Sequence, residues 1–123
     1  MPCRAALGSV LGALLATFFV PAARAAEYTV IDAPGAKNTT LALDVNASGT
    51  VTGWFLDRKK NYNGFLRAPD GSYQTFVVQG AQTEGNALND KGVVAGGYFS
   101  SSLSFLFGYL RTSKGKLKPF DPQ

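Results

Sequence analysis

The chain has 123 residues, twelve basic and eight acidic residues, one cysteine and no histidine. This length allows at most one small domain, and the lack of histidine excludes Ser-His-Asp and Cys-His catalytic machinery. A formal net charge of +4 is too small to indicate nucleic-acid binding, which requires a concentrated basic face.

Residues 1–25 have the pattern of a signal peptide. Arg4 is followed by an uncharged, mostly apolar run over 5–20, then by Pro21 and the small-x-small sequence of residues 23–25. The alternative is a membrane anchor, but a spanning helix needs about 20 apolar residues and this run is shorter. We therefore expect an N-terminal signal helix that is removed, and a secreted or periplasmic protein with no membrane association after cleavage.

Cleavage after residue 25 would change the chemistry of the remaining chain. Cys3, Arg4 and Arg24 would be lost, so that ten basic and eight acidic residues remain, a net charge of +2. The exported body, residues 26–123, would then have neither a thiol nor a disulfide. Small secreted domains often depend on disulfides. Since this one would have none, it must be held together by its core, by self-association or by neighbouring repeats.

The exported body consists of two copies of a repeat of about 44 residues, one over about 38–81 and one over about 82–123. A partial third copy precedes them, since residues 28–36 match residues 73–81. The pairs that carry the repeat are Asn46 and Asn89, Gly49 and Gly92, Val51 and Val94, Gly53 and Gly96, and Gly64–Arg67 and Gly108–Arg111.

Each copy contains four short apolar runs separated by turn residues, a pattern that predicts strands. The fold class expected is all-β: two four-stranded antiparallel repeat units, open or incomplete, plus one leading strand, nine strands in all. The eight runs of the two copies are Leu41–Val45, Thr50–Leu56, Gly64–Arg67, Tyr73–Val78, Ala87–Leu88, Val93–Phe99, Phe105–Arg111 and Leu117–Phe120.

Turns and mid-strand glycines add detail to this prediction. Residues 46–49, 89–92 and 69–71 combine Asn, Asp or Pro with a final Gly, which is typical of tight turns. Gly53 and Gly96 recur in the middle of a strand, where glycine usually marks a close backbone approach or a bulge. We expect the two sheets to be crowded face to face at these glycines.

Four strands in about 44 residues is the size of a propeller blade, and two blades cannot close a ring. Three arrangements remain open at this point. The chain associates with copies of itself, it is a truncated member of a longer array, or its two small sheets pack as a sandwich.

The repeat resembles the HAF-type extracellular repeats of bacterial secreted proteins. The resemblance covers almost all of residues 26–123, although the His-Ala-Phe step is replaced by Asn63-Gly64-Phe65 and Phe107-Gly108-Tyr109. It implies a propeller-like protein outside the cytoplasm and no common enzymatic activity. The other residues that carry it are Asp32–Ala36, Asn46, Gly49, Val51, Gly53, Asp70, Gly71, Phe76, Asn89, Gly92, Val94 and Gly96.

Carboxylates are the remaining candidates for catalysis, and turns or repeat equivalence account for most of them. Residues 44–49 resemble the opening of a calcium loop, but Phe55 stands where that motif requires a Glu, so a turn is the better interpretation. We expect no catalytic residue, no metal site and no cofactor.

The most distinctive segment is the loop over residues 57–63. Arg58, Lys59 and Lys60 lie next to Tyr62 and close to Trp54, which makes these five residues the candidate ligand-contact site. One interpretation is a site for a glycan or an anionic surface. The other is a solvated hairpin tip whose charges prevent edge aggregation.

The sequence therefore predicts an exported, non-enzymatic β-repeat protein that serves as a binding or surface-structural module. The alternative is a part of a larger secreted propeller enzyme or sensor, for example a carbohydrate-active one.

Overall fold

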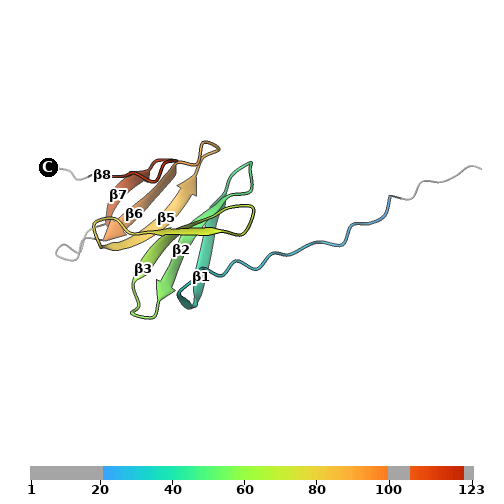
Figure 1. The fold of residues 1–123 in the computed structure, drawn as a ribbon, viewed down its shortest axis with the longest axis horizontal. Helices are drawn as coiled ribbons and strands as arrows, with labels where there is room; N and C mark the ends of the chain where they lie inside the picture. Colours follow the sequence, from blue (N-terminus) through green and yellow to red (C-terminus); the bar gives the residue numbers. More distant parts are fainter. Residues whose placement is uncertain (1–20, 100–105, 121–123) are drawn as a thin grey trace, which may run out of the picture.

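The computed structural model describes residues 21–99 and 106–120. The signal helix expected over 5–20 lies outside these residues. Residues 21–30 run in an extended, exposed path away from the sheets (Figure 1), and residues 21–35 contain neither helix nor strand. Within the described part of the chain, no helix is long and apolar enough to cross a membrane.

The fold is all-β, as the alternating apolar runs predicted, and consists of two four-stranded antiparallel sheets that do not close into a barrel (Figure 1). Within each sheet the strands follow one another in chain order, so that every connection is a hairpin. The first sheet contains β1 (Ala36–Val45), β2 (Val51–Asp57), β3 (Tyr62–Arg67) and β4 (Tyr73–Phe76). The second contains β5 (Gln82–Leu88), β6 (Val94–Phe99), β7 (Leu106–Arg111) and β8 (Leu117–Phe120).

The leading strand predicted from residues 28–36 does not form in the described chain. Ile31 and Ala33 instead pack against the first sheet, next to Phe55 and Phe65. The backbone N–H of Ala33 donates a hydrogen bond of 3.2 Å to Oγ1 of Thr40. The equivalent segment between the two copies, β4, pairs with β3, and the described chain contains no corresponding strand before residues 28–36.

The predicted turns are confirmed and they are the same in both copies. Gly49 and Gly92 have φ values of 83° and 79°, a region that glycine enters without steric cost. Oδ1 of Asn46 accepts a hydrogen bond from the backbone N–H of Thr50, and Oδ1 of Asn89 accepts one from that of Val93, both at 2.9 Å. The two copies therefore share hydrogen bonds as well as sequence.

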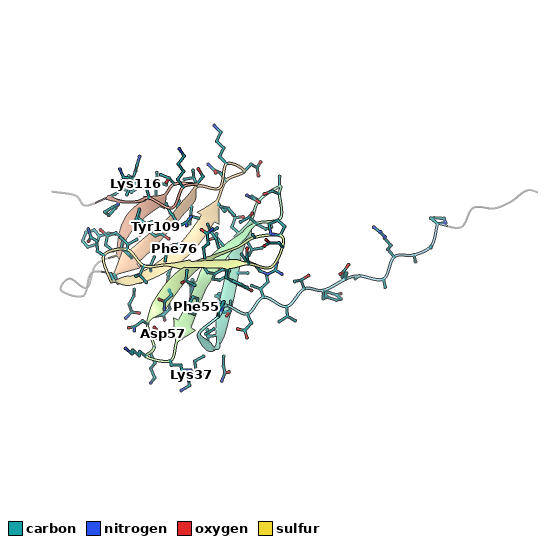
Figure 2. The ribbon with its side chains drawn as sticks, viewed as in Figure 1. Lys37, Phe55, Asp57, Phe76, Tyr109 and Lys116 are labelled. Carbon is teal, nitrogen blue, oxygen red and sulfur yellow. The ribbon has the colours of Figure 1, made fainter. Side chains whose placement is uncertain are left out.

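The sheets meet chiefly through β5, which contacts β1, β2 and β3 of the first sheet. Leu66 of the first sheet packs against Leu88 and Val94 of the second, and the half-buried Phe76 completes this cluster. Phe76 also meets the ring of Tyr109 edge-on at 6.1 Å, and Figure 2 shows the two rings where the sheets meet.

Two further clusters are repeat equivalents of each other. Tyr98, Tyr109 and Val78 are 3%, 1% and 1% exposed and pack on the inner face of the second sheet. The equivalent positions on the first sheet are Phe55, Phe65 and Ala33, which form the other cluster. Each sheet is thus covered by a residue of the segment that leads into it.

The prediction that Gly53 and Gly96 mark a bulge or a close backbone approach is confirmed, but the backbone that their own Cβ atoms would meet belongs to the same sheet. A Cβ on Gly53 would meet the backbone of Leu41 in β1, and one on Gly96 would meet the backbone oxygen of Glu84 in β5. Both glycines lie beside the register shifts that the β1–β2 and β5–β6 pairings contain. They therefore make room for β-bulges within a sheet.

Crowding between the sheets occurs at Gly85 of β5. A Cβ at this position would lie 2.5 Å from Oγ1 of Thr52 and 3.0 Å from the backbone oxygen of Gly53. Thr52 is fully buried, and its hydroxyl donates to the backbone oxygen of Phe65 at 2.9 Å. Glycine at position 85 therefore allows β5 to approach the face of the first sheet.

Candidate functional site

The loop between β2 and β3 is organised around Asp57. Its Oδ1 accepts hydrogen bonds from the backbone N–H groups of Lys59 and Asn61, at 2.8 and 2.9 Å. Its Oδ2 lies 3.4 Å from the side-chain nitrogens of Asn61 and Asn63. The backbone closes the turn with a 3.0 Å bond from the N–H of Lys60 to the oxygen of Asp57. The carboxylate therefore shapes the loop.

These hydrogen bonds also set the charge of Asp57. The backbone N–H of Asn61, followed by that of Lys59, stabilises the carboxylate and lowers the pKa of Asp57 below its ordinary value. An ionised carboxylate that already accepts several hydrogen bonds is a poor proton donor, so Asp57 has the properties of a structural group rather than a general acid.

Arg58, Lys59 and Lys60 are exposed around this turn. Lys60 has a φ of 65°, so the chain turns sharply at the second of the two lysines. Lys37 of β1 lies on the same side of the molecule, and Figure 2 shows it next to Asp57. Four cations thus lie at one end of the first sheet.

Two shallow hollows lie among these cations, and Lys37 and Asn38 line both of them. One is completed by Ala36 and Arg58. The other is completed by Leu56, Asp57, Lys60 and Tyr62. We call Lys37, Asn38, Arg58, Lys60 and Tyr62 the cationic tip. It offers positive charge, a side-chain amide and one aromatic ring on neighbouring strands.

The two aromatic residues of the candidate site contact each other beside the cationic tip. The rings of Trp54 and Tyr62 are 4.7 Å apart between centroids and tilted by 54°. Both side chains are half-buried, and of the two only Tyr62 lines a hollow. Trp54 therefore contacts Tyr62 on the same face of the sheet but does not line either hollow.

Of the five candidate contact residues, Arg58 lines one hollow, Lys60 and Tyr62 line the other, and Trp54 and Lys59 line neither. Sequence reasoning missed Lys37 and Asn38. The pairing of Ala36 with Asp57 across β1 and β2 places them at the site. This could have been found by continuing the predicted first strand back from Leu41 to the register of the loop.

The other acidic side chains near turns are also engaged. Oδ1 of Asp70 accepts hydrogen bonds from the hydroxyl and the backbone N–H of Ser72, at 2.7 and 2.9 Å, and these lower the pKa of Asp70. Asp44, the first residue of the segment that resembles a calcium loop, accepts a hydrogen bond from the backbone N–H of Leu88. Among the described residues, no three His, Cys, Asp or Glu side chains are close enough to hold a metal ion.

Comparison with known proteins gives no identification: no family model, no curated protein and no solved structure matches the chain. The resemblance to HAF-type repeats remains a hypothesis that rests on the motifs quoted above.

Proposed function

We propose that this chain is an exported, non-enzymatic β-repeat protein that binds an anionic polymer, such as an acidic glycan, through the cationic tip. The observation that carries the proposal is that Lys37 and Asn38 line two hollows at once, one completed by Arg58 and the other by Lys60 and Tyr62. The resemblance to extracellular repeats and the signal-peptide pattern of residues 1–25 support the location.

The chemistry of the site suits a sugar polymer that carries carboxylate or sulfate groups. Lys and Arg side chains attract such groups, an amide can bind sugar hydroxyls, and an aromatic ring offers an apolar face for a sugar ring. Asp57 is the nearest acid, and its oxygens are already occupied by the loop. Its hydrogen bonds therefore hold the loop in shape, and its single negative charge is outnumbered by Lys37, Arg58 and Lys60.

Fluorescence titration with a sulfated oligosaccharide tests the proposal, because Trp54 is the only tryptophan of the chain. The probe should change the emission of Trp54 through Tyr62 and bind less tightly as salt is added. Replacing Arg58 and Lys60 with Gln should weaken binding about tenfold or more, since each charge lost costs roughly 1 kcal/mol at low salt.

The chain offers a matched control in the turn between β7 and β8. The variant Lys114→Gln, Lys116→Gln removes the same charge from a second basic hairpin, which Figure 2 places on the opposite side of the view from Lys37. It should bind the probe almost as tightly as the unmodified chain. Equal losses in the two double variants would show attraction to net charge alone and would contradict a site at the cationic tip.

A further inference from the structure

The second sheet has an apolar face that points away from the first sheet. Leu106 is 56% exposed and Phe120 is 55% exposed on this side. Beside them is a shallow hollow that Ala95 and Leu110 line, together with Ala87, Leu88, Asn89 and Val93. We call Ala95, Leu106, Leu110 and Phe120 the outer face.

The same face of the first sheet is covered within the chain. The repeat equivalents of Ala95, Leu106, Leu110 and Phe120 are Thr52, Tyr62, Leu66 and Phe76. Strand β5 packs over this face, so Thr52 is fully buried and Leu66 is 9% exposed. The molecule therefore buries one surface of the repeat in its first copy and leaves it open in its second.

The surface that would cover the outer face is open at the other end of the molecule. Leu88 of β5 is 8% exposed between the sheets, whereas its equivalent in β1, Val45, is 60% exposed. Val45 lines a shallow hollow beside β1, whose lining also includes Ala42, Val51 and Ile31.

The buried cluster between the sheets is thus present a second time, in two separated halves. Leu66 and Phe76 correspond to Leu110 and Phe120 on the outer face, and Leu88 and Val94 correspond to Val45 and Val51 beside β1. Neither half can bury its apolar surface alone, and exposed apolar patches of this kind favour association.

We propose that the outer face of one copy of this chain receives β1 of a second copy, in the arrangement by which β5 packs on the first sheet. The contact is heterologous, because different surfaces of the two copies meet. Such a contact continues from copy to copy and gives a ring where the rotation closes and an open fibre where it does not.

Side-chain sizes at the closest approach identify a second copy as the occupant. Within the chain, Gly85 fits against Thr52 because a Cβ there would lie 2.5 Å from Oγ1. Between copies, the equivalent pair is Ala42 of β1 against Ala95 of the outer face. Ala42 adds the methyl group that Gly85 lacks, and Ala95 removes the hydroxyl and methyl that Thr52 carries. The two changes compensate each other.

Two polar differences make the contact between copies weaker than the one within the chain. Asp44, which accepts a 2.7 Å bond from the N–H of Leu88, has Ala87 as its equivalent. Nη2 of Arg111 donates to Gln74 at 2.7 Å, but the equivalent pair is Arg67 and Lys118, which carry like charges. Association should therefore be reversible and should tighten as salt screens this repulsion.

One residue must move when a second copy binds. Within the chain, Phe76 belongs both to the face that receives β5 and to the cluster around Tyr109. Between copies two different residues correspond to it: Phe120 on the receiving face of one copy, and Ile31 of the second copy. Both cannot occupy one position. Ile31 lies in the extended segment that contains no strand, so it is the residue that we expect to be displaced.

Two blocked variants test the proposal by complementation. Val45→Asp places a charge on the β1 surface and leaves the outer face intact, and Ala95→Arg does the reverse. Sedimentation velocity of the purified protein should show concentration-dependent association that either variant alone abolishes. An equimolar mixture of the two should form a one-to-one dimer, because each variant retains the surface that the other has lost.

Other arrangements give different results. Pairing of two outer faces would leave Val45→Asp fully associated and the mixture without a mixed dimer, which would overturn the proposal. A monomer at every concentration up to the millimolar range would also overturn it and would assign the outer face to a further repeat or another protein.

Three milder substitutions test the pairing itself. Ala95→Thr should weaken association about tenfold by crowding Ala42 of the second copy, and adding Ala42→Gly should restore it. Lys118→Gln recreates the environment of Gln74 and should tighten association severalfold. Loss without rescue in the double variant, or no response to Lys118→Gln, would contradict the proposed register.

Discussion

Oδ2 of Asp44 accepts a hydrogen bond of 2.7 Å from the backbone N–H of Leu88, which joins the end of β1 to the end of β5. The turns beside them are joined as well, since the backbone N–H of Ala47 donates to Oδ1 of Asp90 at 2.8 Å. Each acceptor has an alanine as its repeat equivalent, since Asp44 corresponds to Ala87 and Asp90 corresponds to Ala47. The copies therefore share a fold but have different roles in holding the molecule together.

Replacing Asp44 with Ala should lower the free energy of unfolding by about 1–3 kcal/mol, because it leaves the N–H of Leu88 without its charged acceptor. Urea denaturation followed by circular dichroism measures this change. Lys91→Ala, at an exposed position in the same region, should alter stability by about 0.5 kcal/mol or less. An equal loss in both variants would show that the bond between the two copies contributes little.

Gly85→Ala should destabilise the chain by about 1–3 kcal/mol, since its Cβ would overlap the hydroxyl of Thr52. Thr52→Ala alone should also destabilise, because it removes the hydrogen bond to the oxygen of Phe65. The double variant should lose less than the two single variants together, because the smaller side chain at position 52 leaves room for the added methyl group at position 85. Strict additivity in this double-mutant cycle would contradict face-to-face packing at this point.

Acid should weaken the chain through two turns. The pKa values of Asp57 and Asp70 are lowered in the folded protein, so both carboxylates favour the fold above the unfolded pKa of about 4. This contribution is lost as the pH falls through their lowered pKa values. The double variant Asp57→Asn, Asp70→Asn should therefore show a smaller decrease in Tm between pH 5 and pH 2.

Glu27→Gln is the control for this acid effect, because Glu27 lies in the extended segment outside both sheets. Its Tm should follow the pH in the same way as that of the unmodified chain. A double Asn variant with the full acid dependence would show that other carboxylates cause it.

Tyr109 should carry more of the stability than any other aromatic residue of the second sheet. It is 1% exposed, and its hydroxyl donates to the backbone oxygen of Glu84 at 2.9 Å. Tyr109→Phe should cost about 1 kcal/mol for the lost hydrogen bond, and Tyr109→Ala about 3–5 kcal/mol for the cavity. Burial raises the pKa of Tyr109, so the phenol stays protonated and stability falls only at strongly alkaline pH.

The sequence predicted the all-β class, the two four-stranded units and the turns, because these depend on local patterns. The alternation of side chains along β2 predicts a strand, and Gly49 and Gly92 predict tight turns, without reference to distant residues. The roles of Gly53, Gly85 and Asp44 could not be predicted, since they depend on which strand lies over which face. Nor do local patterns place Lys37 beside the loop of residues 57–63, because the pairing of β1 with β2 brings it there. Trp54, a candidate ligand contact, packs against Tyr62 and lines neither hollow.

A titration of the isotopically labelled protein with a sulfated oligosaccharide, followed by NMR, tests the central claim about function most directly. Binding at the cationic tip predicts that the backbone shifts of Lys37, Asn38, Arg58 and Lys60 and the indole N–H of Trp54 change together, with one affinity. Changes centred on the Lys114–Lys116 turn, or spread evenly over all lysines, would contradict the account.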